Sequence, residues 1–539
     1  MGMSNAKTKR VLWGPKMAGL CIFFLCMSSA MASEVQEQIR RKLEVRFQQN
    51  LRAANEEIRC VESLAVFYTK RLFTPAWGAP QANQLVASLS KAGDEGLDPN
   101  DYHLAQLERL SQSVHPLSPL QKADLDLLLT DAFLLYSSHL LSGKVNPETI
   151  DPDWKVKRRE GDPLALLQLA IAEGAVSAAI KNCMPKHATY VGLKQALVQY
   201  KEIKIAGGWQ EVSSGATLKE GDVDSRVMEV KRRLLSTKDL GANEIGKQNE
   251  FDVKLVEALV HFQKRHNLQA DGAVGPETLA ALNVSVENRI DQIKVNLERW
   301  RWLPQEFSAY YILVNIANFS VEVFKQGGLV SEHKAIVGRD VRRTPVFSST
   351  VSYLVFNPTW TVPPGILNGD VIPGMQKDPN YLKKKNISVF DNNGNKVDPS
   401  TINWKGKGAT AYTYVQPPGP DNALGSVKFM FPNSFSVYLH DTPSRDLFEK
   451  NERSFSSGCI RVQNPLDLAA LLLNDPLKWS LSNMQQLVAT QKTVTVSLKE
   501  QPKIHILYWT AWVNSVGSIQ FRKDVYNRDV ALINALGAK

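Results

Sequence analysis

The chain has 539 residues, of which 22% are charged and 43% hydrophobic, and its formal net charge is +10. This length is too great for a single hydrophobic core, so we expect several domains. The excess of positive charge is mild and forms no stripe of Lys and Arg interleaved with aromatic residues, which argues against nucleic acid as a partner.

Residues 1–32 have the pattern of a cleavable signal peptide. Basic residues precede an apolar run from about Met17 to Met27, and Ala30-Met31-Ala32 supplies small residues for cleavage. The run is shorter than the roughly 20 apolar residues that span a bilayer, so we expect no stable membrane insertion after cleavage. Removal of this segment takes away four positive charges and lowers the net charge from +10 to +6. The sequence therefore predicts an exported protein, with a mildly basic charge that suits an anionic polymer such as a cell wall.

Cleavage leaves three cysteines: Cys60, Cys183 and Cys459. In an oxidising compartment an odd number of cysteines leaves at least one free thiol. Cys60 and Cys183 could form a disulfide, or both could be buried thiols. In either case Cys459 stays unpaired.

The N-terminal part of the mature chain, residues 33–215, is predicted to be a helical scaffold domain. Leucines recur with helical spacing at 125–141 and again at 164–167. No cluster of titratable residues accompanies them, which favours a structural role. Residues 207–221 are rich in glycine and low in apolar residues, and they predict a linker.

Residues 220–284 predict a small three-helix domain, with helices at 223–235, 251–266 and 277–282. A turn-rich stretch precedes the third helix, and the run from Phe262 to Thr278 resembles the peptidoglycan-binding domain. The residues that carry this resemblance are Phe262, Gln263, Leu268, Asp271, Gly272, Gly275 and Thr278. The resemblance implies binding to cell-wall glycan strands, whereas the glycines and leucines alone would also be explained by turns and a core.

Residues 305–500 predict a β-rich catalytic domain. Short β-like runs, separated by turns rich in Gly, Pro and Asn, occur at 311–316, 320–324, 351–356, 427–431 and 435–440. A long polar segment at about 369–425 predicts a mobile lid inserted between strands, although Trp404, Tyr412 and Tyr414 could instead anchor a packed insertion. Residues 501–539 are expected to be a C-terminal extension that packs on this domain. The predicted fold class is thus multidomain α+β, with a helical scaffold, a three-helix insert and a β-rich domain with a capping insertion.

The strongest functional signal lies at the end of the last predicted strand and in the loop after it. Alternation along Phe435–His440 places Tyr438 and His440 on the face opposite the apolar residues. Cys459 follows two serines and Gly458, which allow a tight turn, expose the sulfur and direct peptide N–H groups at an oxyanion. We interpret Cys459 as a nucleophile and His440 as its base.

His440 followed by Ser456-Ser457-Gly458-Cys459-Ile460-Arg461 resembles the signature of the L,D-transpeptidases, the YkuD-type catalytic domain. Ser457 stands where many members have a second histidine, and the Ser-Ser-Gly-Cys form is similar to the large periplasmic YcbB-like subgroup. Further stretches that are similar to this subgroup are Leu297–Pro304, Val337–Arg339, Arg343–Val346, Asn357–Pro364 and Gly419–Gly425.

The resemblance implies a periplasmic cysteine acyltransferase that forms 3→3 peptidoglycan cross-links, takes part in cell-wall organisation and cell shape, and is a target of carbapenems. Its partners would be stem peptides, glycan strands and cell-wall synthesis proteins, without a metal or other cofactor. Catalysis would rest on Cys459 and His440, with the N–H groups of Gly458 and Cys459 as oxyanion donors.

Four residues are candidates for substrate binding: Arg461, Tyr438, Ser457 and Trp360. Arg461 could hold a substrate carboxylate or form a structural ion pair. Tyr438 could orient the imidazole or simply pack, and Trp360 could contact substrate or belong to the core. The group that orients His440 is open between a backbone carbonyl and a serine such as Ser456.

Two rival functions compete with cross-linking. A cysteine peptidase or L,D-carboxypeptidase of wall peptides would use the same thiol, but in the papain-like wall hydrolases the cysteine precedes its histidine. A non-catalytic wall-binding scaffold would not need an intact pair of His440 and Cys459. Both are therefore less favoured than the transpeptidase.

Overall fold

The computed structural model describes residues 34–44, 50–244 and 246–537, so the predicted signal peptide lies outside the described residues. The chain divides into two compact units: one runs to Lys144 and includes Arg159–Pro185, and the other comprises Val145–Arg158 and Lys186 onward. Within the described ranges, no helix combines the length and the apolar character needed to cross a bilayer. The exact domain boundaries expected from the sequence stay a prediction.

The first unit is helical, as predicted, and is built around the long helix α5 (Pro119–Ser142). Ser118 begins this helix with a capping box, and the leucines of α5 are buried on several sides because other helices surround it. The remaining named elements of this unit are β1 (Arg52–Ala53), β2 (Glu56–Glu57), α2 (Val61–Lys70), α3 (Ala79–Leu89), α4 (Leu104–Ser111), α7 (Pro163–Glu173) and α8 (Val176–Cys183).

Buried carboxylates on α5 hold the loops of this unit in place. Asp126 accepts hydrogen bonds from the Tyr68 hydroxyl (2.6 Å) and the Ala76 N–H (2.9 Å), and Asp131 accepts from the Cys60 N–H (2.6 Å). These contacts are structural because they satisfy buried backbone donors. Cys60 and Cys183 are both free thiols. Of the two alternatives expected from the sequence, a disulfide or two separate thiols, the structure has the second.

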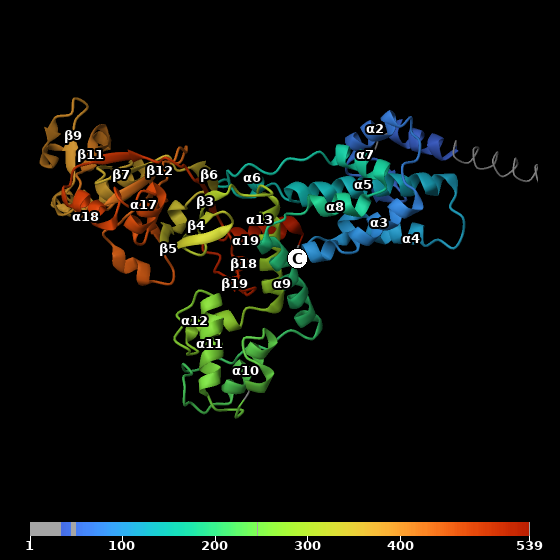
Figure 1. The fold of residues 1–539 in the computed structure, drawn as a ribbon, viewed down its shortest axis with the longest axis horizontal. Helices are drawn as coiled ribbons and strands as arrows, with labels where there is room; N and C mark the ends of the chain where they lie inside the picture. The colour runs from blue at the N-terminus through green and yellow to red at the C-terminus, as the bar shows by residue number, and fades with distance from the viewer. Residues whose placement is uncertain (1–33, 45–49, 245, 538–539) are drawn as a thin grey trace, which may run out of the picture. The chain divides into compact units, whose positions relative to one another are not determined.

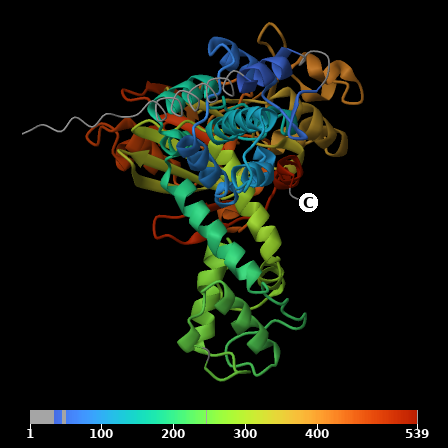
Figure 2. The same ribbon diagram turned by 90° about the vertical axis from the view of Figure 1, so that its right-hand side faces the viewer.

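Two long helices form the frame of the second unit. α9 (Ala188–Ile205) and α13 (Val286–Arg301) run side by side (Figure 2). Between them the chain forms the predicted three-helix module: α10 (Arg226–Ser236), α11 (Val253–Arg265) and α12 (Pro276–Leu282) (Figure 1). The module has its own hydrophobic core.

The turn before α12 shows why the module's signature needs those residue types. Gly272 adopts φ +69°, which favours glycine, and its N–H donates to Oε1 of Gln263 (2.9 Å). The Gln263 amide in turn donates to Asp271 (2.8 Å) and Thr278 (3.1 Å). The signature residues thus brace one turn internally.

The β-rich part of the second unit is one mixed sheet with the strand order β16-β7-β12-β13-β15-β5-β4-β3-β17-β6, and β14 pairs with β5. The strands β12, β13 and β15 are near one another in sequence, and their outer neighbours β7 and β5 come from segments farther back along the chain. The strand bounds are β3 (Tyr310–Asn315), β4 (Ser320–Lys325), β5 (Gly328–Gly338), β6 (Phe347–Thr350), β7 (Tyr353–Phe356), β12 (Val427–Met430), β13 (Leu439–His440), β14 (Ser454–Ser456), β15 (Ile460–Val462), β16 (Val494–Ser497) and β17 (Lys503–Leu507). Helices α17 (Pro465–Leu473) and α18 (Leu481–Ala489) follow β15.

One predicted strand is much shorter than expected. The run 435–440 is a strand only at Leu439–His440, because Ser436 has φ +56° and the Asn433 side chain binds the backbone on both sides of the turn. Its Oδ1 accepts from the N–H groups of Phe435 (3.0 Å) and Val437 (3.1 Å). An Asx-type turn therefore replaces the first half of the expected strand.

The inserted segment between β7 and β12 folds as a packed subdomain. It contains a four-stranded sheet in the order β10-β9-β11-β8 and a hydrophobic core of its own, in which Tyr414 is buried and Trp404 and Tyr412 are partly buried. The alternative of a packed insertion is thus what the structure contains. Its elements are β8 (Trp360–Thr361), α14 (Pro364–Ile366), η6 (Leu367–Val371), α15 (Ile372–Lys377), α16 (Tyr381–Lys384), β9 (Ser388–Phe390), β10 (Lys396–Val397) and β11 (Thr413–Gln416). We call this segment the cap.

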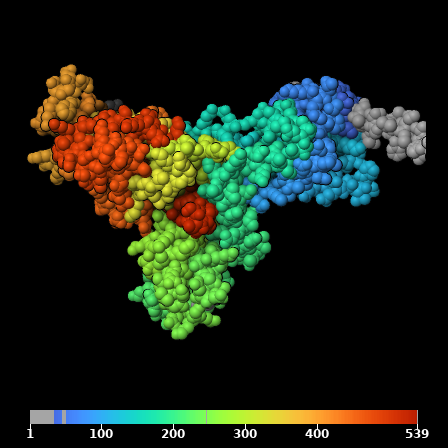
Figure 3. Space-filling view, viewed as in Figure 1, coloured from blue at the N-terminus to red at the C-terminus, as the bar shows by residue number. Residues whose placement is uncertain are grey.

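The C-terminal residues are integrated into the second unit rather than appended to it. β17 pairs with both β3 and β6, and the hairpin β18 (Ala511–Val513) and β19 (Ile519–Phe521) leads to α19 (Arg528–Leu536), which contacts α13. In the space-filling view the red C-terminal segment is set against green parts of the same unit (Figure 3).

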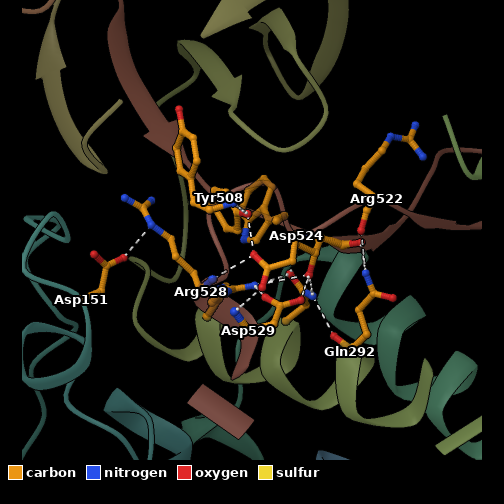
Figure 4. Close-up of polar contacts among 12 residues, drawn as sticks. Asp151, Gln292, Tyr508, Arg522, Asp524, Arg528 and Asp529 are labelled. Atoms are coloured by element: carbon orange, nitrogen blue, oxygen red, sulfur yellow. Dashed lines mark hydrogen bonds and ion pairs between the residues drawn. The ribbon is translucent and has the colours of Figure 1, made fainter. Parts of the chain in front are cut away.

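A buried polar network fixes the start of α19 (Figure 4). Asp524 accepts from the Tyr508 hydroxyl (2.6 Å) and from the N–H groups of Arg528 (2.9 Å) and Asp529 (2.8 Å). Arg528 forms an ion pair with Asp151 at 3.0 Å. One carboxylate therefore satisfies the first N–H groups of the helix and the phenol packed beside it.

Candidate active site

Three neighbouring strands place the predicted catalytic residues on one face of the sheet. Lys428 of β12 pairs with His440 of β13, and His440 pairs with Arg461 of β15. The parallel register of Leu439 with Ile460 puts Tyr438 opposite Cys459. Because side chains alternate along a strand, Lys428, Tyr438, His440, Cys459 and Arg461 share this face.

The backbone turn before Cys459 is held by side-chain hydroxyls. Gly458 has φ +112°, and its carbonyl accepts from the Thr344 hydroxyl at 2.9 Å. The Ser456 hydroxyl donates to the Cys459 carbonyl (2.5 Å) and accepts from the Gly458 N–H (3.1 Å). The Gly458 N–H is therefore engaged in this structure, whereas none of the contacts between described residues uses the N–H of Cys459.

A backbone carbonyl orients the imidazole. Nδ1 of His440 lies 2.5 Å from the Asp441 carbonyl oxygen, which can only accept, so Nδ1 carries the proton and Nε2 keeps its lone pair. The carboxylate of Asp441 is occupied elsewhere, since it accepts from the N–H (2.8 Å) and the hydroxyl (2.7 Å) of Ser426. Of the two candidates for orienting His440, the backbone carbonyl makes the contact. Ser456 instead bonds to the backbone of Gly458 and Cys459.

The thiol and the imidazole share a face without a hydrogen bond between them in the described structure. The Cys459 Sγ lies 3.6 Å from the Ser436 carbonyl oxygen, to which the thiol donates. Catalytic hydrogen bonds in free enzymes are often long and tighten in the substrate complex. This geometry is compatible with a nucleophile that turns toward Nε2 when substrate binds.

Burial controls the ionisation of both groups. It lowers the pKa of His440 to about 3, with further lowering by Arg461 and Lys428. Burial also raises the pKa of the Cys459 thiol, while hydrogen bonds from Tyr438 and the charges of Lys428 and Arg461 oppose this shift. The resting site is therefore a neutral thiol beside a neutral imidazole, and proton transfer must accompany attack.

The other four predicted residues each lie in a different setting. The Tyr438 ring meets the His440 ring edge-on at 5.6 Å, and the hydroxyl of Ser457 accepts from Arg342 at 3.0 Å. Arg461 makes no ion pair with any described residue, and burial lowers its pKa. Trp360 lies in the cap, where it packs against the cap's own core.

Two sets of residues were missed in the sequence. Lys428 is half-buried, and its Nζ lies 4.3 Å from the centroid of the Tyr438 ring; the signal was a lysine inside the otherwise apolar run Val427–Phe431. Arg339 and Arg342 both reach Ser457 from the loop after β5. That contact could not be read from spacing, because more than a hundred residues separate the two segments.

No three metal-ligating side chains come together among the residues described.

Three family models match the chain. Residues 309–496 match the L,D-transpeptidase catalytic domain of the YkuD family, residues 223–282 a peptidoglycan binding domain, and residues 62–197 a scaffold domain. The protein therefore contains a YkuD-type L,D-transpeptidase catalytic domain together with a peptidoglycan-binding domain and a helical scaffold. The resemblance seen in the sequence is confirmed.

Among curated proteins, the chain is similar to a Haemophilus influenzae protein named "Putative L,D-transpeptidase", with 37% identity over 246 residues. The match covers 46% of this chain and 50% of the relative, so the chain spans about half the length of the curated relative that it matches.

Two solved L,D-transpeptidases match the chain at low similarity. One, from Mycobacterium smegmatis, is 14% identical, covers 37% of this chain and 58% of its own, and has a TM-score of 0.19. The other, from Xylanimonas cellulosilytica, is also 14% identical, covers 55% of this chain and 100% of its own, and has a TM-score of 0.18. A TM-score this low says nothing about function.

Proposed function

We propose that the protein is a periplasmic L,D-transpeptidase that joins two peptidoglycan stem peptides in a 3→3 cross-link through an acyl-enzyme on Cys459. The observation that supports this most directly is the shared face of Cys459 and His440, with Nδ1 of His440 donating to a carbonyl and Nε2 left as a base. The matched catalytic and peptidoglycan-binding domains support the same polymer as substrate.

In the first half-reaction, the Cys459 thiol gives its proton to Nε2 of His440, and Sγ bonds to the carbonyl carbon between the third and fourth residues of a tetrapeptide stem. The C–N bond breaks, the amine of the terminal D-alanine takes the proton from His440, and a thioester remains. In the second half-reaction, the side-chain amine of a diaminopimelate residue in another stem attacks the thioester and gives a proton to His440. The thiol of Cys459 is regenerated, so one D-alanine is released for each cross-link.

The developing oxyanion needs a donor, and we assign this role first to the N–H of Cys459. The N–H of Gly458 can contribute once it leaves Ser456, and loss of one such donor typically costs about 3 kcal/mol of barrier stabilisation. Arg461 and Tyr438 are proposed to contact the substrate, with Ser457 and Trp360 as further binding residues. Glycan strands would be held by residues 220–284, and cell-wall synthesis proteins are proposed as partners.

Substitution of the nucleophile tests the proposal. We expect wild-type protein to convert purified tetrapeptide muropeptides into 3→3 dimers and Cys459→Ala to form none, as measured by mass spectrometry of the products. The thermal unfolding midpoint of Cys459→Ala, measured separately, should stay unchanged. Dimer formation by Cys459→Ala at the wild-type rate would show that the nucleophile is a different residue. Release of tripeptide without dimer by the wild type would instead identify an L,D-carboxypeptidase, with water as the acyl acceptor.

Carbapenem labelling checks the same thiol independently of the natural substrate. A strained β-lactam carbonyl should acylate Cys459, giving one adduct per chain by intact mass and mapping to the peptide that contains Cys459. Cys459→Ser serves as the matched control and should remain unlabelled. An adduct of equal yield on Cys459→Ser would refute the assignment.

A further inference from the structure

The loop between β5 and β6, residues 339–343, carries three arginines and lies against the turn that holds Cys459; we call it the arginine loop. A Cβ atom at Gly338 would come within 2.8 Å of the Thr344 N–H nitrogen and closer still to the Arg342 carbonyl, so the entry to the loop requires glycine. The Thr344 hydroxyl accepts from the Gly338 N–H at 2.9 Å and donates to the Gly458 carbonyl at 2.9 Å. The loop and the catalytic turn are thus pinned together by their backbones.

Two guanidinium groups of this loop converge on Ser457, two residues before the nucleophile. Nη1 of Arg342 donates to the Ser457 hydroxyl at 3.0 Å, and Nη2 of Arg339 at 3.5 Å. The third arginine is committed within its own loop, since Arg343 pairs with Asp340 at 2.6 Å. Arg339 and Arg342 are therefore the positive charges presented beside the catalytic turn.

A carboxylate from the cap forms ion pairs with both of these guanidinium groups. Asp370, in η6, lies 2.5 Å from Arg342 and 3.5 Å from Arg339. Arg342 also donates to the Gly365 carbonyl of the cap at 3.2 Å. The cap backbone approaches the arginine closely, since a Cβ atom at Gly369 would overlap Nη2 of Arg342 and displace its guanidinium group.

The contact has the properties of an exchangeable one. One carboxylate faces two guanidinium groups, which leaves a positive charge in excess, and the buried Nε of Arg339 has no hydrogen-bond partner among the described residues. The three side chains keep between 23% and 42% of their surface exposed, and ion pairs that contact water are weak. Another carboxylate could therefore replace Asp370 at small cost.

We propose that Arg339 and Arg342 form a subsite for a free carboxylate of the stem peptide, and that Asp370 of the cap occupies this subsite in the free enzyme. The inference rests on the proposed function for the identity of the ligand. The planar guanidinium of Arg342 suits a carboxylate, and its contact with Ser457, two residues before Cys459, places the subsite beside the turn that carries the proposed nucleophile. Entry of the substrate carboxylate releases Asp370 and frees the cap at this point.

Binding can be measured without turnover, in full-length Cys459→Ala protein by calorimetry with a synthetic tetrapeptide stem. We expect Arg342→Ala, added to this protein, to weaken binding about tenfold or more, because a charge-assisted hydrogen bond is lost. Arg343→Ala removes the same charge from the same loop and should bind as the parent does. Asp370→Asn should bind the stem several-fold more tightly, since the competing carboxylate is gone.

Three modified peptides identify which carboxylate is recognised, because a tetrapeptide stem with a γ-linked D-glutamate has three free carboxylates. One peptide is amidated at the terminal D-alanine, one on the diaminopimelate side chain and one at the α-carboxylate of the glutamate. We expect one of the three to bind as weakly to the parent as the free acid binds to Arg342→Ala, and to be insensitive to that substitution. Equal loss in Arg342→Ala and Arg343→Ala, or equal binding of the free acid and all three amides, would overturn the subsite.

The cross-linking assay separates this inference from the proposed function. If the wild type forms no 3→3 dimer but binding still depends on the carboxylate and on Arg342, the proposed function fails and the subsite stands. If dimers form but neither Arg342→Ala nor Asp370→Asn changes binding, the subsite fails alone. Thermal unfolding midpoints report whether each variant is folded. If Arg342→Ala does not fold, binding by Asp370→Asn still decides the test.

Discussion

At the scale of single residues, burial and the nearby charges act in opposite directions on the Cys459 thiol, and burial has the larger influence on its pKa. Burial alone disfavours the thiolate, while Lys428 and Arg461 favour it from the two strands that flank His440. Both cations also disfavour the imidazolium form of His440, so they lower the pKa of the imidazole as well as that of the thiol. The resting pair is therefore neutral, and transfer of the thiol proton to His440 has to accompany attack of the sulfur on the substrate carbonyl.

The thiolate can be followed by the pH dependence of alkylation. Because the folded-state pKa of Cys459 is raised, its reaction with iodoacetamide should still increase with pH beyond the usual range of a free cysteine. Lys428→Met removes a stabilising charge, so the midpoint should move upward by about one pH unit or less, and alkylation at neutral pH should slow by up to about tenfold. Intact mass against time at a series of pH values measures this. Lys155→Met, at an exposed lysine, should leave the profile in place, and an unchanged profile in Lys428→Met would show that Lys428 does not act on the thiolate.

At the scale of elements, the cap is a folded body rather than a loose loop. Its four strands and its core give its own amides protection, so opening would have to occur where the cap joins the sheet and where Asp370 meets the arginine loop. Polar composition alone suggested a mobile lid, because the scattered apolar residues that form the core have no helical or strand period.

Hydrogen exchange can locate the motion of the cap. We expect slow exchange in β9 and β11, where ladder hydrogen bonds and the core protect the amides, and faster exchange at residues 364–371. Asp370→Asn should accelerate exchange at 364–371 and leave β9 and β11 unchanged, and a stem peptide bound to Cys459→Ala protein should do the same because its carboxylate releases Asp370. Uniform protection in free, stem-bound and Asp370→Asn protein would rule out a moving cap.

Sequence reasoning placed His440 and Cys459 in one candidate site because strand alternation and a glycine before the cysteine are local signals. Predicted elements such as the helices of the three-helix module and the strands at 310–315 and 320–325 lie within a few residues of where they were expected. Sequence could not supply the contact of Thr344 with Gly458, because 114 residues separate them. The pairing of Lys428 with His440 depends on strand order and register, and the shortened strand at 435–440 depends on a side chain that binds its own turn.

At the scale of the whole molecule, the C-terminal residues hold the second unit together. β17 is an interior strand of the large sheet, and the carboxylate of Asp524 caps α19 while it accepts from Tyr508 (Figure 4). A terminal segment used in this way is not dispensable, since its loss would leave β3 and β6 without a partner between them.

Removal of the Asp524 carboxylate at the start of α19 should therefore destabilise the fold. In Asp524→Ala the N–H groups of Arg528 and Asp529 and the buried Tyr508 hydroxyl lose their acceptor, and we expect the free energy of unfolding to fall by about 2 to 4 kcal/mol. A lower thermal unfolding midpoint measures this. Asp446→Ala, at an exposed aspartate, is the control and should unfold as the wild type does. A midpoint for Asp524→Ala equal to that control would show that the network contributes nothing to stability.

The chain leaves α9 and returns to α13 at nearly the same point. Nε1 of Trp209 donates to the Val284 carbonyl at 3.1 Å, and Lys204 lies 3.6 Å from Glu287. If the residues between these helices were unstructured, pairing α9 with α13 would require closure of a long flexible loop, whose entropy cost rises with length. Once the three-helix module has folded, that loop is replaced by a short bridge, and the helix pair becomes a local contact. We therefore expect the module to form first and its formation to speed the assembly of the body that carries the large sheet.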